Sequence, residues 1–325
     1  MGAGSIGLTF GATLARGGHL VTVLGRPRSA EALLSLGSVD LSGQLAFTVP
    51  VTGPPARPGR VAVIGQAADI PAADAILFTP KGQDLAESIE QVARARPDDA
   101  QGGTWVAGFQ NGVVKDELLA AAFGSANVVG AASVLGARRA SAGDVYVAGL
   151  GTTYFGEFGA GSSSRTELIT TAFLDAGLPC IAVPEIRALL WAKFCNAVGV
   201  FGVTALTGLP TVEIFARAPL AFVYRSLLEE AAAVAAAEGV VVGDFPDLPM
   251  RTYLEPAPED VVAEMTRRAV RRTDQPPGYS SMAQDLAAGR RTEVEETFGD
   301  LVRRARSHGI DVPRSELVYR VVRGF

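Results

Sequence analysis

The chain has 325 residues, of which 48% are hydrophobic and 19% charged, and its formal net charge is −5. This length is typical of two domains rather than one. The negative net charge excludes a general electrostatic attraction to nucleic acid.

Targeting signals and cysteine usage both favour a cytoplasmic protein. We find no signal peptide, and the longest apolar stretch, residues 194–206, is interrupted by Asn196 and is too short to span a bilayer. The two cysteines, Cys180 and Cys195, lie in apolar segments without metal-ligand spacing, which argues against a disulfide framework. We therefore expect a soluble cytoplasmic protein with no membrane partner.

The first half of the chain alternates strand-like and helical segments. We expect a helix over residues 4–15 behind a glycine turn, followed by a strand at 20–24. Further strands are expected at residues 75–78, 104–107 and 127–130, with helices at 84–95 and 116–122, and an antiparallel addition at 145–147 and 153–155. Such alternation predicts a parallel sheet with helices on both faces. Residues 1–183 are therefore expected to form a Rossmann-like, doubly wound α/β domain.

Beyond Pro184 the pattern becomes helical. The expected helices cover residues 187–206, 219–238, 259–272, 281–288 and 293–307. The sequence therefore predicts an all-α second domain over residues 184–325, whose apolar helix faces are compatible with a homodimer.

A glycine-rich turn opens the chain. Gly2-Ala3-Gly4-Ser5-Ile6-Gly7 matches the pattern G-x-G-x-x-G ahead of a helix and a strand. In this pattern the first glycine permits a tight turn, the second lets a pyrophosphate approach the backbone, and the third allows close helix packing. The amino end of the helix then faces the phosphates. Gly2, Gly4, Ser5, Ile6 and Gly7 are therefore candidate cofactor-binding residues.

The strand at 20–24 ends at Gly25-Arg26-Pro27-Arg28. An acidic residue at this place would contact the ribose 2′-hydroxyl of NAD, whereas an arginine suits the 2′-phosphate of NADP. Arg26 and Arg28 therefore favour NADP(H) as the cofactor. The alternative is that these arginines belong to an ordinary charged surface loop.

The glycine turn of a dinucleotide-binding domain follows a buried strand. Here Met1 directly precedes Gly2, so the first strand is truncated. Because that strand is central in a doubly wound sheet, we expect the natural protein to begin a few residues upstream with an apolar strand.

Lysine is nearly absent from the chain. Of the 29 lysine and arginine residues only three are lysine, namely Lys81, Lys115 and Lys193. Arginine holds its proton too firmly to donate it, whereas burial tunes a lysine ammonium toward neutral pH. Lys193 lies in an apolar helix, where a charged group is costly unless it is used. We predict that Lys193 is needed as an amine, the alternative being the chance survival of one lysine.

Histidine is equally rare. His19 lies where a helix gives way to a strand, and His308 lies at a helix carboxyl end, where the helix dipole favours a cation. Both are interpreted as structural residues. We therefore expect no bound metal.

Five short motifs occur in a recognisable order. They are Gly2 to Gly7, Thr79-Pro80-Lys81, Gln110-Asn111-Gly112, Trp191-Ala192-Lys193, and Ser280 to Asp285 followed by Arg291-Thr292-Glu293. Through them the chain resembles the ketopantoate reductase family (2-dehydropantoate 2-reductase) over nearly its whole length. The resemblance implies hydride transfer from NADPH to the ketone of a 2-oxo acid, first of all 2-dehydropantoate, whose reduction to pantoate belongs to pantothenate biosynthesis.

The same resemblance implies a role for each site residue. Lys193 is the expected proton donor, and Glu293 is expected to hold the active site and the cofactor. Ser281 is expected to bind the substrate, and Lys81 and Asn111 to line the cofactor. Asn111 offers an amide near the nicotinamide and is also a candidate substrate-binding residue. Hydride arrival builds negative charge on the carbonyl oxygen, which a nearby ammonium stabilises and protonates. The plainer alternatives are turn or helix-capping roles for Lys81 and Asn111, a helix amino-cap role for Ser280 and Ser281, and a first-turn helix role for Glu293.

Two positions depart from the family pattern. The family usually has asparagine four and often eight residues after the lysine, and here these positions are Ala197 and Phe201. Asn196 lies three residues after Lys193 on the same helix face and is a candidate substrate-binding residue. The alternatives to 2-dehydropantoate reduction are therefore a reductase for a more apolar 2-oxo acid and a catalytically idle NADP(H) sensor or scaffold.

Overall fold

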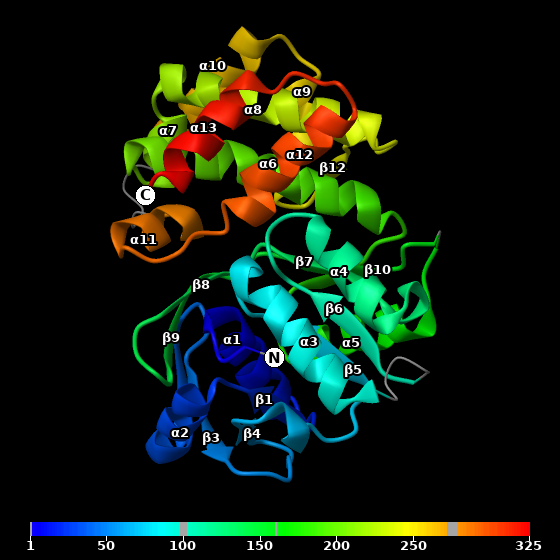
Figure 1. Ribbon diagram of the computed structural model, residues 1–325. Coiled ribbons are helices and arrows are strands. Elements are labelled where there is room, and N and C mark those ends of the chain that lie inside the picture. Colours follow the sequence, from blue (N-terminus) through cyan, green and yellow to red (C-terminus); the bar gives the residue numbers. More distant parts are fainter. Residues whose placement is uncertain (1, 98–102, 160, 272–277) are drawn as a thin grey trace. The chain divides into compact units, whose positions relative to one another are not determined.

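The computed structural model describes residues 2–97, 103–159, 161–271 and 278–325 (Figure 1). The chain divides into two compact units. The first comprises Met1–Gln110 and Lys115–Ile186, and the second comprises Asn111–Val114 and Arg187–Phe325. Each unit has its own architecture.

Strands of the first unit form three hydrogen-bonded sheets. The six-stranded sheet has the order β1-β4-β3-β2-β9-β8, the three-stranded sheet β11-β10-β7, and the two-stranded sheet β5-β6. The strands are β1 (Val21–Leu24), β2 (Ser38–Gly43), β3 (Phe47–Thr52), β4 (Val61–Ile64), β5 (Ala75–Phe78), β6 (Trp105–Gly108), β7 (Gly130–Ser133), β8 (Gly136–Arg139), β9 (Asp144–Gly149), β10 (Thr153–Gly156) and β11 (Cys180–Ala182).

These sheets contain both parallel and antiparallel strand pairs. β1 and β3 both pair in parallel with β4, β5 pairs in parallel with β6, and β2 pairs in parallel with β9. The pairs β2–β3, β8–β9 and β7–β10 are antiparallel. The expected α/β class with a parallel-rich sheet is thus confirmed, and the antiparallel pairs curl the sheet instead of leaving it open.

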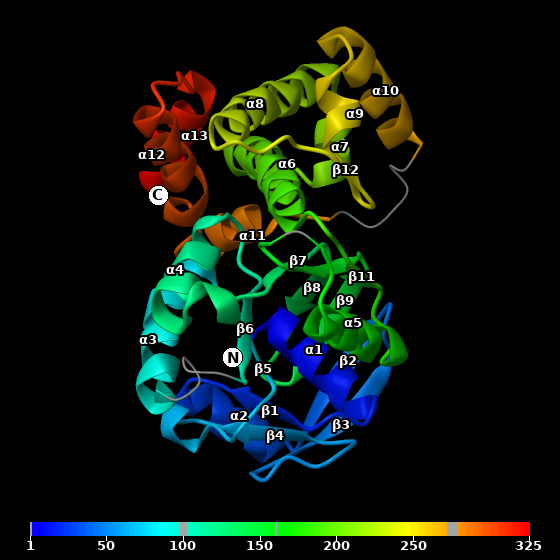
Figure 2. The same ribbon diagram turned by 90° about the vertical axis from the view of Figure 1, so that its right-hand side faces the viewer.

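Helices of the first unit cover these strands. They are α1 (Ser5–Arg16), α2 (Pro27–Leu36), α3 (Leu85–Ala95), α4 (Val114–Phe123) and α5 (Ser164–Asp175). Helix α1 contacts β1, β3, β8 and β9, so the six-stranded sheet wraps around it (Figure 2). Its residues 8–15 are all buried. Gly11 permits this close packing, because a Cβ atom there would lie 3.1 Å from Val23.

An aromatic cluster fills the core beside α1. The Phe10 ring packs edge-on against Phe109 and Phe173, with centroid distances of 5.1 and 5.0 Å. Phe155 packs against both of these partners, and also against Trp105 of β6. Edge-to-face pairs are a favourable arrangement of aromatic rings. The cluster therefore fixes α1, with the glycine turn at its amino end, against β6 and β10.

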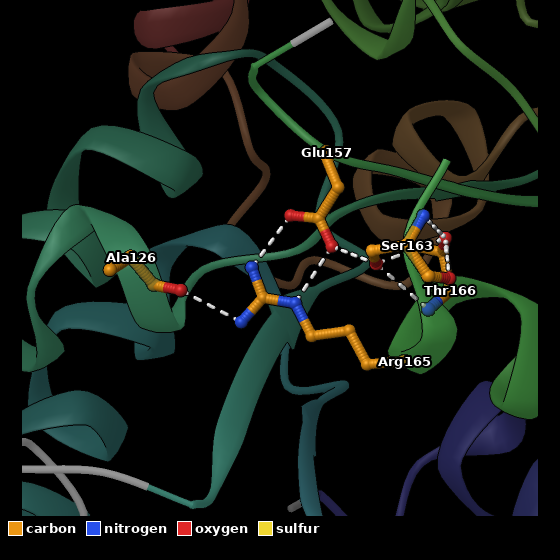
Figure 3. Close-up of polar contacts among 5 residues, drawn as sticks. All are labelled: Ala126, Glu157, Ser163, Arg165 and Thr166. Atoms are coloured by element: carbon orange, nitrogen blue, oxygen red, sulfur yellow. Dashed lines mark hydrogen bonds and ion pairs between the residues drawn. The ribbon is translucent and has the colours of Figure 1, made fainter. Parts of the chain in front are cut away.

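An ion pair joins β10 to the start of α5 (Figure 3). Arg165 donates through Nε and a terminal nitrogen to both carboxylate oxygens of Glu157, at 2.7 and 2.6 Å. Its other terminal nitrogen donates to the Ala126 carbonyl at 2.7 Å. Ser163, the amino cap of α5, also donates to Glu157. These hydrogen bonds hold the pKa of the Glu157 carboxyl below its usual value, the bond from Arg165 contributing most.

Glu157→Gln is expected to destabilise the protein by about 1–3 kcal/mol at neutral pH, because charge-assisted hydrogen bonds are lost. A carboxyl whose pKa is lowered by folding stabilises the fold above its unfolded pKa, and this stability disappears as the pH falls through the folded pKa. The difference between variant and wild type should therefore shrink below pH 4.5, the ordinary value for glutamate. Denaturant unfolding at several pH values measures it. Glu264→Gln, which removes surface ion pairs with Arg267 and Arg268, is the control and should have little effect.

The second unit is largely helical. Its helices are α6 (Ile186–Thr207), which starts one residue before the unit, α7 (Thr211–Phe215), α8 (Ala218–Ala237), α9 (Met250–Leu254), α10 (Pro258–Val270), α11 (Ser281–Ala287), α12 (Asp300–Ser307) and α13 (Pro313–Arg323), with a π-helical turn, η5 (Glu295–Gly299). A short hairpin of β12 (Asp244–Phe245) and β13 (Leu248–Pro249) also occurs. The expected helical second domain is confirmed, and this short hairpin is the exception to its all-α description.

Helix α6 is longer than the apolar stretch in the sequence suggests. It has 22 residues and is long and apolar enough to cross a membrane by length and composition, so the argument from insufficient length is wrong. However, 72% of its apolar window is buried inside the protein. Gly199 and Gly202 lie directly against side chains of α8. Its hydrophobicity is therefore that of a core helix.

Two element boundaries also differ from expectation. The strand expected at 127–130 begins at Gly130, because residues 125–127 form a 3-10 turn and Val128 makes only a single bridge, to Val106. The helix expected over 259–272 ends at Val270, and residue 272 lies outside the described part of the chain.

Candidate active site

The glycine turn closes tightly at its first and third glycines. The Gly2 amide donates to the Leu24 carbonyl at the end of β1, at 3.0 Å, and the Thr79 hydroxyl donates to the Gly2 carbonyl. Gly2 has a φ of 94°, and a Cβ atom there would lie 2.8 Å from the backbone of Thr79. A Cβ atom on Gly7 would lie 2.0 Å from the Gly2 carbonyl oxygen. Any larger residue at either position would force this turn open.

The second glycine leaves the backbone accessible. A Cβ atom on Gly4 would have no neighbour closer than the Thr79 carbonyl oxygen at 4.0 Å. Gly4 is the amino cap of α1, whose first turn has no acidic residue and no capping hydrogen bond from a side chain. Ser5 and Ile6 continue this turn and are half-buried. An open backbone at an uncapped helix amino end fits a pyrophosphate group.

Arg26 follows β1 directly and is the amino cap of α2. Its side chain is exposed and forms an ion pair with Asp84 at 2.9 Å. Asp84 ends the short 3-10 turn η2 (Gly82–Asp84), whose amino cap is the half-buried Lys81. The structure thus links the loops that follow β1 and β5, on which the predicted residues Arg26 and Lys81 lie.

Arg139 was not identified from the sequence. It ends β8, and one of its terminal nitrogens donates to the carbonyl of Ala3 in the glycine turn at 2.7 Å, across 136 residues of chain. This contact depends on the curling of the sheet around α1. No local sequence motif predicts this contact, because the two residues meet only through the tertiary fold.

A chain of hydrogen bonds joins three predicted residues in the second unit. Lys193 Nζ donates to Asn111 Oδ1 at 3.2 Å, and Asn111 Nδ2 donates to Glu293 Oε2 at 3.0 Å. Lys193 and Asn111 are half-buried, whereas Glu293 is only 5% exposed. Asn111 therefore uses both ends of its amide to connect the ammonium with the carboxylate. The structure brings together these three residues from segments far apart in the sequence.

Helix α6 presents a narrow polar face around Lys193. Between residues 188 and 200 only Lys193, Asn196 and Val200 are not fully buried. Positions three and four apart share one face of a helix, so an ammonium, an amide and an isopropyl group follow one another. Ala197 and Phe201, at the two positions where the resemblance leads us to expect asparagines, are buried at 6% and 7% exposure.

The two serines ahead of α11 have different environments. Ser280 is the amino cap of the helix, accepting from the Ala283 amide at 3.1 Å and sharing a hydrogen bond of 2.6 Å with Thr204. Ser281 is half-buried, and its hydroxyl forms no hydrogen bond with another described residue. The capping role considered for this pair thus belongs to Ser280, and the Ser281 hydroxyl keeps its capacity to bind a ligand.

A second carboxyl accompanies Glu293. Glu296 is the second residue of the π-helical turn. Its Oε2 atom is buried without a hydrogen-bond partner among the described residues. Burial, assisted by the negative charge of Glu293, raises the pKa of the Glu296 carboxyl. π-helical turns often occur at functional sites. The sequence offers no signal for this turn.

Several known proteins similar to this chain are described as ketopantoate (2-dehydropantoate) reductases. The family model described as ketopantoate reductase PanE/ApbA matches residues 1–160, and the model of its C-terminal part matches residues 185–325. The 2-dehydropantoate 2-reductase of Halobacterium salinarum is 30% identical over 313 residues, with 96% of this chain and 93% of that protein covered. That of Archaeoglobus fulgidus is 29% identical over 326 residues, with 100% and 96% covered.

Solved structures agree with the sequence matches. The crystal structure of 2-dehydropantoate 2-reductase from Geobacter metallireducens has 26% sequence identity and a TM-score of 0.81, covering 100% of this chain and 98% of that one. The expected oxidoreductase class and family are thus confirmed. Because the two family models together match most of its residues, the chain belongs to the ketopantoate reductase family.

Proposed function

We propose that the protein reduces a 2-oxo acid to a 2-hydroxy acid with NADPH, and that 2-dehydropantoate is the substrate to test first. The observation that carries this proposal is the hydrogen-bonded chain from Lys193 through Asn111 to Glu293. Family membership and the names of the relatives support the same reaction.

Each residue of the chain has a distinct task in the proposed reaction. Bound NADPH supplies the hydride to the ketone carbon. Lys193 stabilises the negative charge that develops on the ketone oxygen and donates a proton from Nζ, forming the hydroxyl group. The neutral amine then recovers a proton from solvent. Asn111 holds the ammonium in one direction and joins it to the carboxylate of Glu293.

The remaining predicted residues divide between cofactor and substrate. We assign the binding of the cofactor phosphates to Gly2, Gly4, Ser5, Ile6 and Gly7. Arg26 and Lys81 bind the cofactor from the loops that follow β1 and β5. Ser281, with its uncommitted hydroxyl, suits the substrate carboxylate as a hydrogen-bond donor. In this scheme residues 1–183 carry the NADP(H) site and residues 184–325 carry the proton donor. Asn111 is the exception, because it lies in the first range but is hydrogen-bonded to Lys193 and Glu293 in the second.

Arg26→Ala is expected to raise the Kd for NADPH about 10- to 100-fold and to leave the Kd for NADH nearly unchanged, because only NADPH carries the 2′-phosphate. Fluorescence titration of the reduced nicotinamide measures both constants. Arg60→Ala, which removes an exposed arginine just before β4, is the matched control. Equal losses for the two cofactors would contradict the assignment of Arg26 to the 2′-phosphate.

A spectrophotometric assay of NADPH oxidation with a panel of 2-oxo acids tests the proposed function. The panel contains 2-dehydropantoate, shorter acids and acids with larger apolar side chains, since Val200 offers an apolar surface beside Asn196. Turnover of at least one acid supports the proposal. Tight NADPH binding without turnover of any acid would favour the idle sensor instead.

A further inference from the structure

Asn196 has one fixed hydrogen bond inside the second unit. The hydroxyl of Tyr224, on α8, donates to Asn196 Oδ1 at 2.8 Å. Tyr224 is fully buried and Asn196 half-buried. The bond therefore runs from the core of the helical unit to the half-exposed face of α6, three residues from Lys193.

The fold positions Tyr224 closely against α6. Gly199 lies beside the tyrosine ring, and a Cβ atom on Gly199 would lie 2.6 Å from two ring carbons of Tyr224. Phe215 packs edge-on against the other side of the ring, with a centroid distance of 4.8 Å at 90°. The missing side chain at position 199 thus permits the approach that brings the Tyr224 hydroxyl to Asn196.

This contact determines which end of the amide faces outward. A fully buried hydroxyl requires an acceptor, since a buried donor without a partner is destabilising. Only the Oδ1 end of the amide can accept, so Oδ1 faces Tyr224 and the Nδ2 group is left on the other side. Nδ2 forms no hydrogen bond with another described residue. Asn196 therefore offers donors, and no acceptor, on the face that it shares with Lys193.

The spacing on α6 suggests what this donor meets. Residues three apart on a helix have Cβ atoms about 5–6 Å apart. A 2-oxo acid whose ketone oxygen meets Lys193 can therefore extend the following carbons of its chain along the same helix face, toward Asn196. Val200, one turn beyond Asn196, continues the face with an apolar side chain. A 2-oxo acid with an acceptor oxygen on its fourth carbon and methyl groups on its third fits this face. Its oxygen can accept from Asn196, and its methyl groups can contact Val200.

We propose that Tyr224 is a positioning residue for specificity: it holds the Asn196 amide so that Nδ2 donates to a side-chain oxygen of the substrate. The site then selects 2-oxo acids that carry such an oxygen over acids of similar size that are wholly apolar. This inference rests on the proposed reductase function. Burial raises the pKa of the Tyr224 hydroxyl well above its usual value, so the tyrosine remains a donor over the working pH range.

A matched pair of substrates tests the proposal. 2-Dehydropantoate carries a hydroxyl group on its fourth carbon, and 3,3-dimethyl-2-oxobutanoate is the same acid without it. We expect Asn196→Ala to lower the ratio of their kcat/KM values about tenfold or more, and Tyr224→Phe to lower it about three- to tenfold, because a hydrogen bond to the hydroxyl is lost or misdirected. In the double variant the ratio should equal that of Asn196→Ala, since Tyr224 acts only through Asn196.

A control separates orientation from general weakening of the fold. Tyr319→Phe removes the same atom from another tyrosine of the second unit, whose hydroxyl donates to Glu295 at 2.9 and 3.0 Å, and should leave the ratio unchanged. The deoxy acid should be reduced almost equally by wild type and Tyr224→Phe. An unchanged ratio in Tyr224→Phe, or additive effects in the double variant, would overturn the proposal.

Calorimetry distinguishes failure of this inference from failure of the reductase function. If wild type reduces neither acid, binding of the two acids to the NADPH-saturated protein replaces the kinetic ratio. Weaker binding of 2-dehydropantoate to Asn196→Ala, with unchanged binding of the deoxy acid, supports the assigned donor. Equal binding of both acids to wild type and variant contradicts it. If Tyr224→Phe fails to fold, Asn196→Ala alone decides by the same two criteria.

Discussion

Lys193→Ala is expected to lower kcat about 10²- to 10⁴-fold, the usual contribution of a general acid, and to leave the Kd for NADPH almost unchanged. The ammonium stabilises charge that exists only as the ketone is reduced, so its loss affects the chemical step rather than cofactor binding. Steady-state NADPH oxidation and a fluorescence titration measure the two quantities.

Lys193→Arg is the matched control for charge. Arginine keeps the positive charge but does not release its proton, so we expect it to recover only a small part of the lost activity. Because Lys193 donates to Asn111 at 3.2 Å, the longer guanidinium also has to displace this contact. An alanine variant with activity near wild type would show that Lys193 is not the proton donor.

Asn111→Asp is expected to lower kcat/KM about 100-fold at neutral pH, comparable to removing one preorganised hydrogen-bond donor from an active site. The amide nitrogen that donates to Glu293 at 3.0 Å would become an oxygen, so two carboxyl groups would face each other. Two carboxylates in contact cannot both remain ionised without cost, and the pKa of one is raised. The proton that it takes up restores a donor.

Lower pH should therefore recover part of the activity of Asn111→Asp, measured as kcat/KM against pH. Asn111→Ala, which removes the bridge without adding charge, is the control and should lose activity without this recovery. Parallel pH profiles for the two variants would contradict the idea that Asn111 acts by joining Lys193 to Glu293.

Much of the first unit could be predicted because its signals are local. The glycine turn, the helix behind it and the apolar run that became β1 lie within 24 residues of one another. The strands at β5 and β6 are short apolar runs followed by turns. By contrast β2 (Ser38–Gly43) and β3 (Phe47–Thr52) carry mixed polar residues and alternate in burial. Their pattern is weak, and they become strands through pairing with each other and with β9 and β4.

The scarcity of lysine was informative for one residue and silent for another. Lys193, the predicted proton donor, donates a hydrogen bond to Asn111, which is another predicted site residue. Lys115 survives for a structural reason, because it is buried at 2% exposure and donates to both carboxylate oxygens of Asp116 at 2.7 Å. Composition alone does not separate these cases, since a buried ion pair and a proton donor both require a lysine in apolar surroundings.

Contacts between segments that are distant in the sequence could not be predicted from sequence motifs. The bond from Arg139 to the glycine turn and that from Tyr224 to Asn196 each join residues from different elements. In neither contact does one residue belong to a motif from which its partner could be predicted. The sequence placed Asn196 on the correct helix face by its spacing, whereas the direction of its amide depends on α8.

Transfer of a labelled hydride tests the proposed function most directly. The protein is incubated with 2-dehydropantoate and NADPH deuterated on the transferable face of the nicotinamide, and the product is analysed by mass spectrometry. We predict pantoate with one deuterium at carbon 2, formed at a rate that Lys193→Ala reduces about 10²- to 10⁴-fold. Unlabelled product, or NADPH binding with no hydroxy acid from this or any other 2-oxo acid, would contradict the account.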